Sequence, residues 1–355
     1  MRILICNWKD LGHPRAGGAE VWTDGIARAW VDAGHAVTLA CSRATGQPVH
    51  EERGGVTIAR GGDYRIGVHA HVRSVYERAP RPFDVVLDEI NTRPFGAPRW
   101  AGQSKVIAFV HQVAREVWFR ETAWPVALAG RFVLEPAWLR GYRHVPVYTP
   151  SVSTATSLHR YGLSHACALP QGSARPEVPV DPVAKESSPT FVFVGRLCAM
   201  KRPLHAMAAF RRVQRAFPEA RLWIIGRGPH EDRVRRHLGP GMELLGAVSA
   251  AERDDRVSRA HALLATSVRE GWGLVVSEAA ALGTFTIGYA VPGLVDSIRA
   301  TRGVLVPPTP PALGTAMLDV ARAPALAPRP SSTGTVPFGE VASRLLATCS
   351  VTTDA

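Results

Sequence analysis

The clearest indication of the fold lies in residues 190–203, which read TFVFVGRLCAMKRP. The first five residues are an apolar, β-branched run that predicts a buried strand. Gly195 ends this strand, and Pro203 is a favourable first residue for a helix. Arg196 and Lys201 lie on the loop between the two elements. Because ligands of open α/β sheets bind at the carboxyl ends of strands, this loop predicts an anion site, with a solvated basic loop as the alternative.

Runs of the same kind alternate along the chain with segments of helical period, which indicates βα units and parallel sheets. In the first half, the expected strands are Arg2–Cys6, Ala36–Cys41, Asp84–Leu87, Lys105–Val110 and Val145–Tyr148. In the second half, they are Thr190–Val194, Arg221–Ile225, His261–Ala265 and Thr284–Ile287. The pattern occurs twice, so we expect an α/β protein of two Rossmann-like domains.

The length of 355 residues suits two domains of ordinary size. We expect an N-terminal domain over residues 1–170 and a C-terminal domain over residues 190–325. Residues 171–189 carry Gly, Pro, Ser and charges without an apolar period, and are therefore expected to form an interdomain linker. Residues 326–355 form a tail rich in Pro, Ser and Thr, in which Phe338–Leu346 predicts a short closing helix.

Composition places the chain among globular proteins, with 46% apolar residues and no apolar stretch long enough to cross a bilayer. The apolar run after Arg2 is too short for a secretory signal. The five cysteines show no metal-ligand spacing and suit a reducing compartment; they are Cys6, Cys41, Cys167, Cys198 and Cys349. A soluble, cytoplasmic protein is therefore expected.

The net charge of +12 predicts attraction to polyanions, such as nucleic acid, an anionic membrane surface or phosphorylated small molecules. Lysine occurs only at positions 9, 105, 185 and 201, so most of the charge is arginine. With abundant Ala and Pro, this indicates a coding bias more than a function. No nucleic-acid-binding module is recognisable, and we expect no nucleic-acid partner.

A second motif, GGAE at residues 17–20, follows the first strand and opens a helix expected to end near Ala33. Gly17 and Gly18 let a ligand approach the backbone, and the amides of a helix N-terminus favour phosphate. The alternative is a tight strand-to-helix turn without a ligand.

The third and most specific motif is REGWGLVVSEA, residues 269–279, again after an expected strand. Its glycine-flanked turn exposes amides ahead of a helix, where they can meet phosphate. Carboxylates of Glu270 and Glu278 match the hydroxyl donors of two sugar rings, one of them a ribose. Ordinary glutamates on a helix surface are the alternative.

In order and spacing, the three motifs resemble those of retaining glycosyltransferases of the GT-B fold, family 4, over nearly the full chain. The resemblance implies two Rossmann-like domains facing each other across a cleft, the N-terminal one binding the acceptor and the C-terminal one the nucleotide sugar. It implies transfer of a hexose or N-acetylhexosamine from a nucleotide diphosphate sugar, with UDP favoured over GDP. The acceptor is not identified by the sequence; we expect a small molecule or glycan in cell-surface glycan or natural-product biosynthesis. No cofactor is implied.

The resemblance also assigns roles to residues. The expected catalytic residues are His111, Arg196, Lys201 and Glu270. The expected donor-binding residues are Gly17, Gly18, Gly195, Gly271, Trp272, Gly273, Leu274 and Glu278. Arg196 and Lys201 would neutralise the donor diphosphate, Glu278 would hold the ribose, and Glu270 and His111 would contact the transferred sugar.

The mechanism implied is a front-face displacement in which the departing phosphate assists deprotonation of the acceptor, so that no covalent nucleophile is needed. No carboxylate has a motif-level claim to that role; Asp88 and Glu89 end an expected strand and are candidates. The sequence contains neither an Asp-X-Asp element nor a His-rich cluster, so no essential metal is expected. It departs from the family at Trp272, where Phe is usual, at Gln171, where Asn is usual, and in its shortened tail.

Acceptor recognition is expected around residues 114–120, Trp124, Trp138 and Arg140, a region rich in aromatic and basic side chains. Aromatic faces stack on sugars and arginines bind phosphate. The same composition suits docking to an anionic membrane surface, at the inner face of the membrane for a cytoplasmic protein. Tryptophans of an ordinary core are the alternative.

Three other classes of protein stay open. Gly226 and Gly228 follow an expected strand, as in dinucleotide dehydrogenases, but the third glycine and the acidic ribose partner are missing. A GT-B sugar-nucleotide epimerase uses a similar donor site without an acceptor region. A non-catalytic nucleotide-sugar-binding protein would carry the same motifs.

Overall fold

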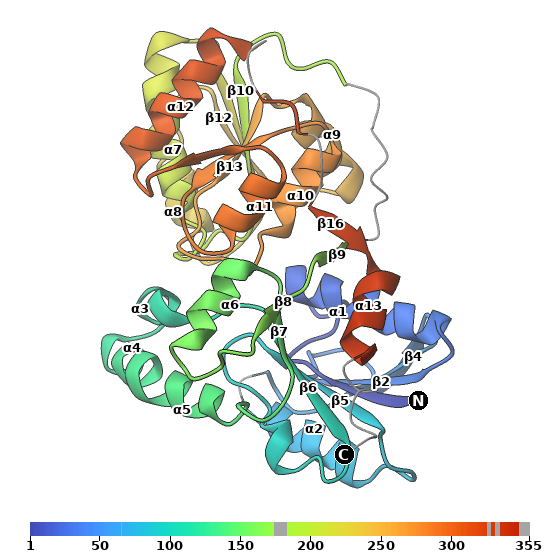
Figure 1. The fold of residues 1–355 in the computed structure, drawn as a ribbon. Coiled ribbons are helices and arrows are strands. Elements are labelled where there is room, and N and C mark those ends of the chain that lie inside the picture. Colours follow the sequence, from blue (N-terminus) through green and yellow to red (C-terminus); the bar gives the residue numbers. More distant parts are fainter. Residues whose placement is uncertain (65, 174–182, 325–327, 331–333, 348–355) are drawn as a thin grey trace. The chain divides into compact units, whose positions relative to one another are not determined.

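A computed structural model describes residues 1–64, 66–173, 183–324, 328–330 and 334–347 (Figure 1). Residues 174–182 of the expected linker, parts of the expected tail and Cys349 lie outside these residues. The chain divides into two compact units. Unit 1 comprises Met1–Arg115, Pro125–Pro176 and Val336–Ala355. Unit 2 comprises Glu116–Trp124 and Glu177–Thr335.

Unit 1 contains an eight-stranded sheet in the order β3-β4-β2-β1-β5-β6-β7-β8. Its strands are β1 (Arg2–Cys6), β2 (Ala36–Cys41), β3 (His50–Arg53), β4 (Val56–Arg60), β5 (Val85–Ile90), β6 (Lys105–Val110), β7 (Val147–Thr149) and β8 (Cys167–Ala168). All neighbours pair in parallel except β3 and β4. The five strands expected in the first half are thus confirmed. The last of them begins later because Pro146 has no N–H to donate to the ladder.

The helices of unit 1 are α1 (Gly18–Asp32), α2 (Val68–Glu77), α5 (Glu135–Arg140), α6 (Val152–His159) and α13 (Phe338–Ala347). Helix α4 (Trp124–Ala129) also belongs to unit 1, except for its first residue, Trp124, which is grouped with unit 2. A π-helical turn, Gly130–Leu134, joins α4 to α5. Helix α1 forms because its apolar residues recur every four positions, at Trp22, Ile26 and Trp30. These side chains are buried against sheet residues such as Leu39 and Phe109.

The closing helix expected at Phe338–Leu346 is confirmed as α13, and it packs on α1 (Figure 1). The indole of Trp30 donates a hydrogen bond to the carbonyl oxygen of Ala342 at 3.0 Å. Val341 and Leu345 are fully buried in the core of unit 1. The C-terminal helix is therefore part of the first compact unit, a point that the sequence leaves open.

A small second sheet pairs β9 (Gln171–Ser173) with β16 (Thr335–Pro337). Both strands lie in segments expected to be irregular, one at the start of the linker and one in the tail. Their composition gives no apolar alternation, and pairing with a segment distant in sequence satisfies their backbone groups. Such non-local pairing is not visible in local sequence.

Unit 2 contains a six-stranded sheet in the order β12-β11-β10-β13-β14-β15, parallel throughout. The strands are β10 (Thr190–Val194), β11 (Arg221–Ile225), β12 (Met242–Gly246), β13 (Ala262–Ala265), β14 (Thr286–Tyr289) and β15 (Val304–Val306). The four strands expected in the second half are confirmed. β14 begins at Thr286 and not at Thr284, because the N–H of Thr284 closes the preceding helix on Ala279 O. β12 and β15 are half-buried edge strands that the apolar pattern missed.

The helices of unit 2 are α3 (Trp118–Glu121), α7 (Pro203–Ala216), α8 (Glu231–Arg236), α9 (Ala250–Arg259), α10 (Leu274–Ala281), α11 (Leu294–Ala300) and α12 (Pro310–Arg322). Helices α7 and α12 pack on each other and cover one apolar side of the sheet (Figure 1). Buried Phe191, Phe210 and Met317 contribute to this core. The expected α/β class with parallel sheets is confirmed in both units.

No helix among the described residues is both long enough and apolar enough to cross a membrane.

Replacing Leu345 with alanine should lower the free energy of unfolding of unit 1 by about 2–5 kcal/mol, because the side chain is fully buried. Arg344→Ala is the matched control. Its exposed ion pair with Glu340 should change stability by less than about 0.5 kcal/mol. Chemical denaturation followed by circular dichroism measures both effects. Equal effects of the two changes would contradict the packing of α13 on α1.

Candidate active site

The loop after β10 holds two of the expected catalytic residues, Arg196 and Lys201. It is fixed to the neighbouring loop after β11 by hydrogen bonds from Gly195 N to Ile225 O at 3.0 Å and from Leu197 N to Arg227 O at 2.9 Å. Arg196 is exposed and forms no ion pair within the described part of the chain.

Gly226 has a structural reason to be glycine. Its φ is +134°, and a Cβ there would lie 2.0 Å from the carbonyl oxygen of Gly195. The loop after β11 can approach the loop of Arg196 only because this side chain is missing. The Gly226–Gly228 pattern, which suggested a dehydrogenase, is therefore accounted for by packing.

Lys201 and Glu270 come from the loops after β10 and β13 and meet at the carboxyl edge of the sheet. The Lys201 ammonium forms an ion pair with Glu270 Oε1, and the hydroxyl of Ser267 donates to the same oxygen at 2.5 Å. Glu270 is only 8% exposed. Burial of a carboxylate is costly without such partners, so this contact holds both charged groups in place.

The loop after β14 contacts the backbone of Glu270. The N–H of Glu270 donates to Pro292 O at 3.0 Å. Gly293 has a φ of +83°, and a Cβ there would lie 2.2 Å from the carbonyl oxygen of Glu270. The backbone position of Glu270 thus depends on a glycine 23 residues further along the chain.

The remaining expected residues of this motif surround the start of α10. Gly273 is the N-cap residue with a left-handed φ of +88°, and Leu274 begins the helix. The indole of Trp272 donates to the hydroxyl of Ser277 at 2.8 Å, which ties Trp272 to the first turn. Glu278 lies one turn after Leu274, and its Oε2 is 3.7 Å from Arg253 Nη1. Gly271 stands directly after Glu270, at intermediate exposure.

In unit 1, Gly17 and Gly18 form the junction between the β1 loop and α1. Gly17 is the N-cap residue, and its N–H donates to Glu20 Oε2 at 2.6 Å. Glu20 is buried and pairs with Lys9 at 3.2 Å. The Gly17 amide therefore already has an acceptor. Gly18 is the first helical residue, whose N–H has no acceptor from an earlier turn and suits an anion.

His111 directly follows β6, and its Nε2 lies 3.0 Å from Glu89 Oε2. The hydroxyl of Thr23 on α1 donates to the same oxygen at 2.6 Å. Glu89 is fully buried, and its Oε1 has no hydrogen-bond partner in the described structure. Burial raises the pKa of Glu89, and the bonds from His111 and Thr23 oppose this rise. Glu89 is thus placed to orient the imidazole.

The two carboxylates considered as nucleophiles are both inaccessible. Asp88 and Glu89 are 0% exposed. Asp88 accepts hydrogen bonds from Phe95 N at 3.1 Å, Ala97 N at 3.0 Å and the Tyr142 hydroxyl at 2.5 Å, which gives it a structural role. Neither carboxylate is placed to attack a sugar.

Asp10, which the sequence did not single out, anchors the loop that leads to Gly17. Arg60 donates to its carboxylate at 2.9 Å and 3.0 Å, and Gly12 N donates at 2.9 Å. Burial by itself would raise the pKa of Asp10, yet the hydrogen bonds from Arg60 and Gly12 and the charges of Arg60 and Arg53 lower it to about 2. The sequence did not indicate this role of Asp10, because Asp10 and Arg60 lie 50 residues apart in the chain.

The structure thus brings the expected residues together in two sets. One set, in unit 1, contains Gly17, Gly18 and His111, which are linked through α1 and the Thr23–Glu89 bond. The other set, in unit 2, lies at the carboxyl edge of its sheet and contains Gly195, Arg196, Lys201, Glu270, Gly271, Trp272, Gly273, Leu274 and Glu278. Among the described residues, no three His, Cys, Asp or Glu side chains are grouped as metal ligands.

Comparison with known proteins gives a class to this arrangement. The profile of the family described as "Glycosyl transferases group 1" matches residues 175–333, so this segment is a glycosyltransferase group 1 domain. No curated protein matches the chain.

Solved structures match nearly the whole chain. The sucrose-phosphate synthase of Thermosynechococcus elongatus superimposes with a TM-score of 0.73 at 19% identity, over 98% of this chain and 94% of that one. WaaG, a glycosyltransferase involved in lipopolysaccharide biosynthesis, gives 0.70 at 15% identity, over 99% and 96%. Anabaena HepE in complex with UDP-glucose gives 0.68 at 15% identity, over 99% of both chains. These likenesses show the fold, which is the α/β fold of GT-B glycosyltransferases.

Replacing Asp10 with asparagine should lower the free energy of unfolding at pH 7 by about 2 kcal/mol, since the pKa falls from 3.8 to about 2 on folding. Because the folded pKa is lowered, this stabilisation is present above the unfolded pKa and is lost as the pH falls from about 4 through about 2. Denaturation series at several pH values measure it. A wild-type stability that falls no more than that of Asp10→Asn between these pH values would contradict the Asp10–Arg60 contact.

Proposed function

We propose that this chain is a metal-independent, retaining glycosyltransferase of family 4. It transfers a hexose or N-acetylhexosamine from a UDP-sugar to an acceptor of cell-surface glycan or natural-product biosynthesis. The observation that carries the proposal is the Lys201–Glu270 ion pair at the carboxyl edge of a sheet that belongs to a glycosyltransferase group 1 domain. A fixed cation and a carboxylate at this place suit a substrate with both phosphates and sugar hydroxyls.

In this proposal, Arg196 and Lys201 neutralise the donor diphosphate, and the Gly18 amide adds a donor at a helix N-terminus. Arg196 is exposed and without an ion pair in the described structure, so it is available to an incoming anion. Glu270 accepts from hydroxyls of the transferred sugar through the lone pairs that Lys201 and Ser267 leave open. Glu278 accepts from the ribose.

The reaction is a front-face displacement. The acceptor oxygen forms a bond to the anomeric carbon while the bond from that carbon to the β-phosphate oxygen breaks. The departing phosphate oxygen takes the proton of the acceptor hydroxyl, and UDP leaves. The positive charges of Arg196 and Lys201 stabilise the negative charge that grows on this phosphate. The configuration at the anomeric carbon is retained without a covalent intermediate.

His111 contacts the donor sugar in this scheme, and Glu89 positions it. The buried carboxylate accepts from Nε2 and fixes the plane of the ring and the tautomer, which leaves Nδ1 for the substrate. Trp22 and Phe109 confine the ring further, with centroids 5.3 Å and 4.9 Å from that of His111.

The choice of UDP rests on similarity. The structures that match this chain include HepE in complexes with UDP and with UDP-glucose. They also include AviGT4, a glycosyltransferase involved in avilamycin A biosynthesis, and WaaG of lipopolysaccharide biosynthesis. These are functions of those proteins, and they support both pathway classes for this chain.

We further propose that the enzyme works at an anionic membrane surface, through an exposed apolar face formed by Trp124, Pro125, Val126, Phe132 and Val133. These residues belong to the helical segment from α4 through the π-helical turn. Trp124 is 68% exposed, Phe132 62% and Val133 61%. Of the expected aromatic region, Trp124 and Phe119 are therefore exposed and do not belong to the core.

The charge around this face supports an anionic bilayer as its proposed occupant. The guanidinium of Arg131 lies 5.1 Å over the ring of Phe132, and Arg140 is exposed at the end of α5. Tryptophan and phenylalanine favour the interface of a bilayer, and arginines beside them favour anionic headgroups. The net charge of +12 acts in the same direction.

A thermal-shift screen with UDP, GDP and TDP and their common sugars tests the proposed function. UDP-sugars should raise the melting temperature of the wild type, because a ligand of the folded state stabilises it. Glu278→Ala should lose most of this shift, while Glu219→Ala, at an exposed glutamate of unit 2, should keep it. The shift and any transfer should persist in EDTA.

Stabilisation by none of these nucleotides would refute the transferase proposal. Conversion of the donor sugar into an isomer without transfer would indicate an epimerase. Binding with neither reaction, in the presence of a broad set of acceptors, would indicate a non-catalytic nucleotide-sugar-binding protein.

The membrane proposal predicts that the protein sediments with vesicles containing phosphatidylglycerol and not with pure phosphatidylcholine vesicles. Trp124→Ser and Phe132→Ser should each weaken binding by about tenfold or more, because full burial of such a side chain contributes about 1.5–3 kcal/mol. Ile66→Ser, at an exposed apolar residue elsewhere in unit 1, is the control. Equal binding by all four proteins would contradict the assigned face.

A further inference from the structure

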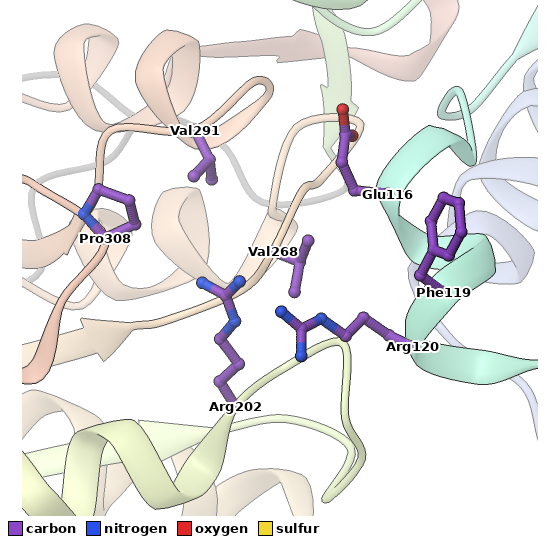
Figure 2. Close-up of a pocket in the computed structure, with 7 residues that line it drawn as sticks. All are labelled: Glu116, Phe119, Arg120, Arg202, Val268, Val291 and Pro308. Atoms are coloured by element: carbon purple, nitrogen blue, oxygen red, sulfur yellow. The ribbon is translucent and has the colours of Figure 1, made fainter. Parts of the chain in front are cut away.

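Unit 2 contains a pocket that shares no residue with the expected donor site. Its volume is about 520 Å³, and it is lined by Glu116, Phe119, Arg120, Arg202, Val268, Val291 and Pro308 (Figure 2). All seven residues belong to unit 2. The volume falls within the range of about 300–1,000 Å³ that is usual for small-molecule sites.

One wall of the pocket comes from the same edge of the sheet as the donor residues. Arg202 follows Lys201 and precedes α7, while Val268, Val291 and Pro308 follow β13, β14 and β15. Arg202 has a left-handed φ of +50°, which is unfavourable for a residue with a side chain. The N–H of Arg202 is held by Cys198 O at 3.2 Å. The loop thus fixes the backbone from which the Arg202 side chain enters the pocket.

The opposite wall is the segment Glu116–Trp124, which is anchored to the sheet edge by two contacts. Glu116 Oε2 pairs with Arg269 Nε at 3.1 Å, and Glu121 Oε1 accepts from Met200 N at 3.2 Å. The carboxylates of Glu116 and Glu121 are therefore bound by Arg269 and Met200, and not by Arg120 or Arg202. Arg120 extends from the same segment toward Arg202 (Figure 2).

Arg120 and Arg202 form no ion pair within the described residues. Burial and the nearby charge of Arg120 lower the pKa of Arg202. Burial, Arg202 and Arg120 also lower the pKa of His205 on α7. Two like charges that face each other without a counterion repel, and an anion between them would remove this repulsion.

We propose that this pocket binds an anionic group, a phosphate or a carboxylate, carried by the acceptor of the transfer reaction. The planar forks of two arginines suit either group. Val268, Val291 and the ring of Phe119 provide apolar surface for the carbon skeleton next to it. This assignment rests on the proposed function, and it narrows the acceptor to anionic molecules.

The test measures binding of inorganic phosphate and of acetate to the full chain by isothermal titration calorimetry at constant ionic strength. The proteins are the wild type, Arg120→Gln, Arg202→Asn and the control Arg215→Gln, whose arginine is exposed on α7. Asparagine is chosen at position 202 because it accepts the left-handed conformation. Circular dichroism verifies that each variant is folded.

The wild type and Arg215→Gln should bind at least one of the two anions with equal affinity, and each pocket variant should bind it at least tenfold more weakly. Preference for phosphate would identify a phosphorylated acceptor, and preference for acetate a carboxylated one. Absence of binding to the wild type, or equal binding by all four proteins, would overturn the assignment.

Two further measurements separate this inference from the proposed function. Arg196→Gln, which changes the expected donor site, should leave binding of the anion unchanged; a loss there, with the pocket variants unaffected, would place the anion at the donor site and overturn the inference. UDP should bind the wild type and both pocket variants with similar affinity. Failure of the wild type to bind UDP would count against the proposed function, while the anion titration would still report on the pocket.

Discussion

The parallel pairing of the unit 2 strands is the constraint on which the candidate site depends. Because all six strands run in the same direction, every loop that follows a strand lies at one edge of the sheet. Lys201 and Glu270 meet there although 69 positions separate them in the sequence. The anion pocket uses the loops of the same edge. One topological rule thus places the proposed donor residues of this unit and the wall of the anion pocket that contains Arg202.

In unit 1 the same rule acts together with buried charge. The carboxyl ends of β5 and β6 carry Glu89 and His111, and α1 approaches them with Thr23. A carboxylate this deep is tolerated only with hydrogen-bond partners, and the two partners of Glu89 come from α1 and from the position after β6. The network therefore connects the glycine-rich start of α1 to the histidine. The buried pair of Asp10 and Arg60 holds the loop that leads into that helix.

The fold could be read from local patterns wherever a strand is buried, which is why nine strands were expected at nearly their observed positions. Edge strands such as β12 and the strand pair β9–β16 were not predicted. A half-buried edge strand has no clear apolar period, and pairing with a distant segment is not visible in local sequence. The site was readable where glycines and charges follow a strand, as in residues 195–201. The roles of Asp10 and Glu89 were not, because each depends on a residue far away in the sequence. The roles assigned to the motif residues remain predictions.

We propose that the chain transfers a sugar from UDP with retention of configuration. Proton NMR of the first sugar released from a UDP-α-hexose into water, recorded before mutarotation, tests it most directly. We expect that the α-anomer appears first and that Lys201→Met releases it far more slowly. First appearance of the β-anomer would contradict the retaining mechanism, and equal rates for the two proteins would contradict the site.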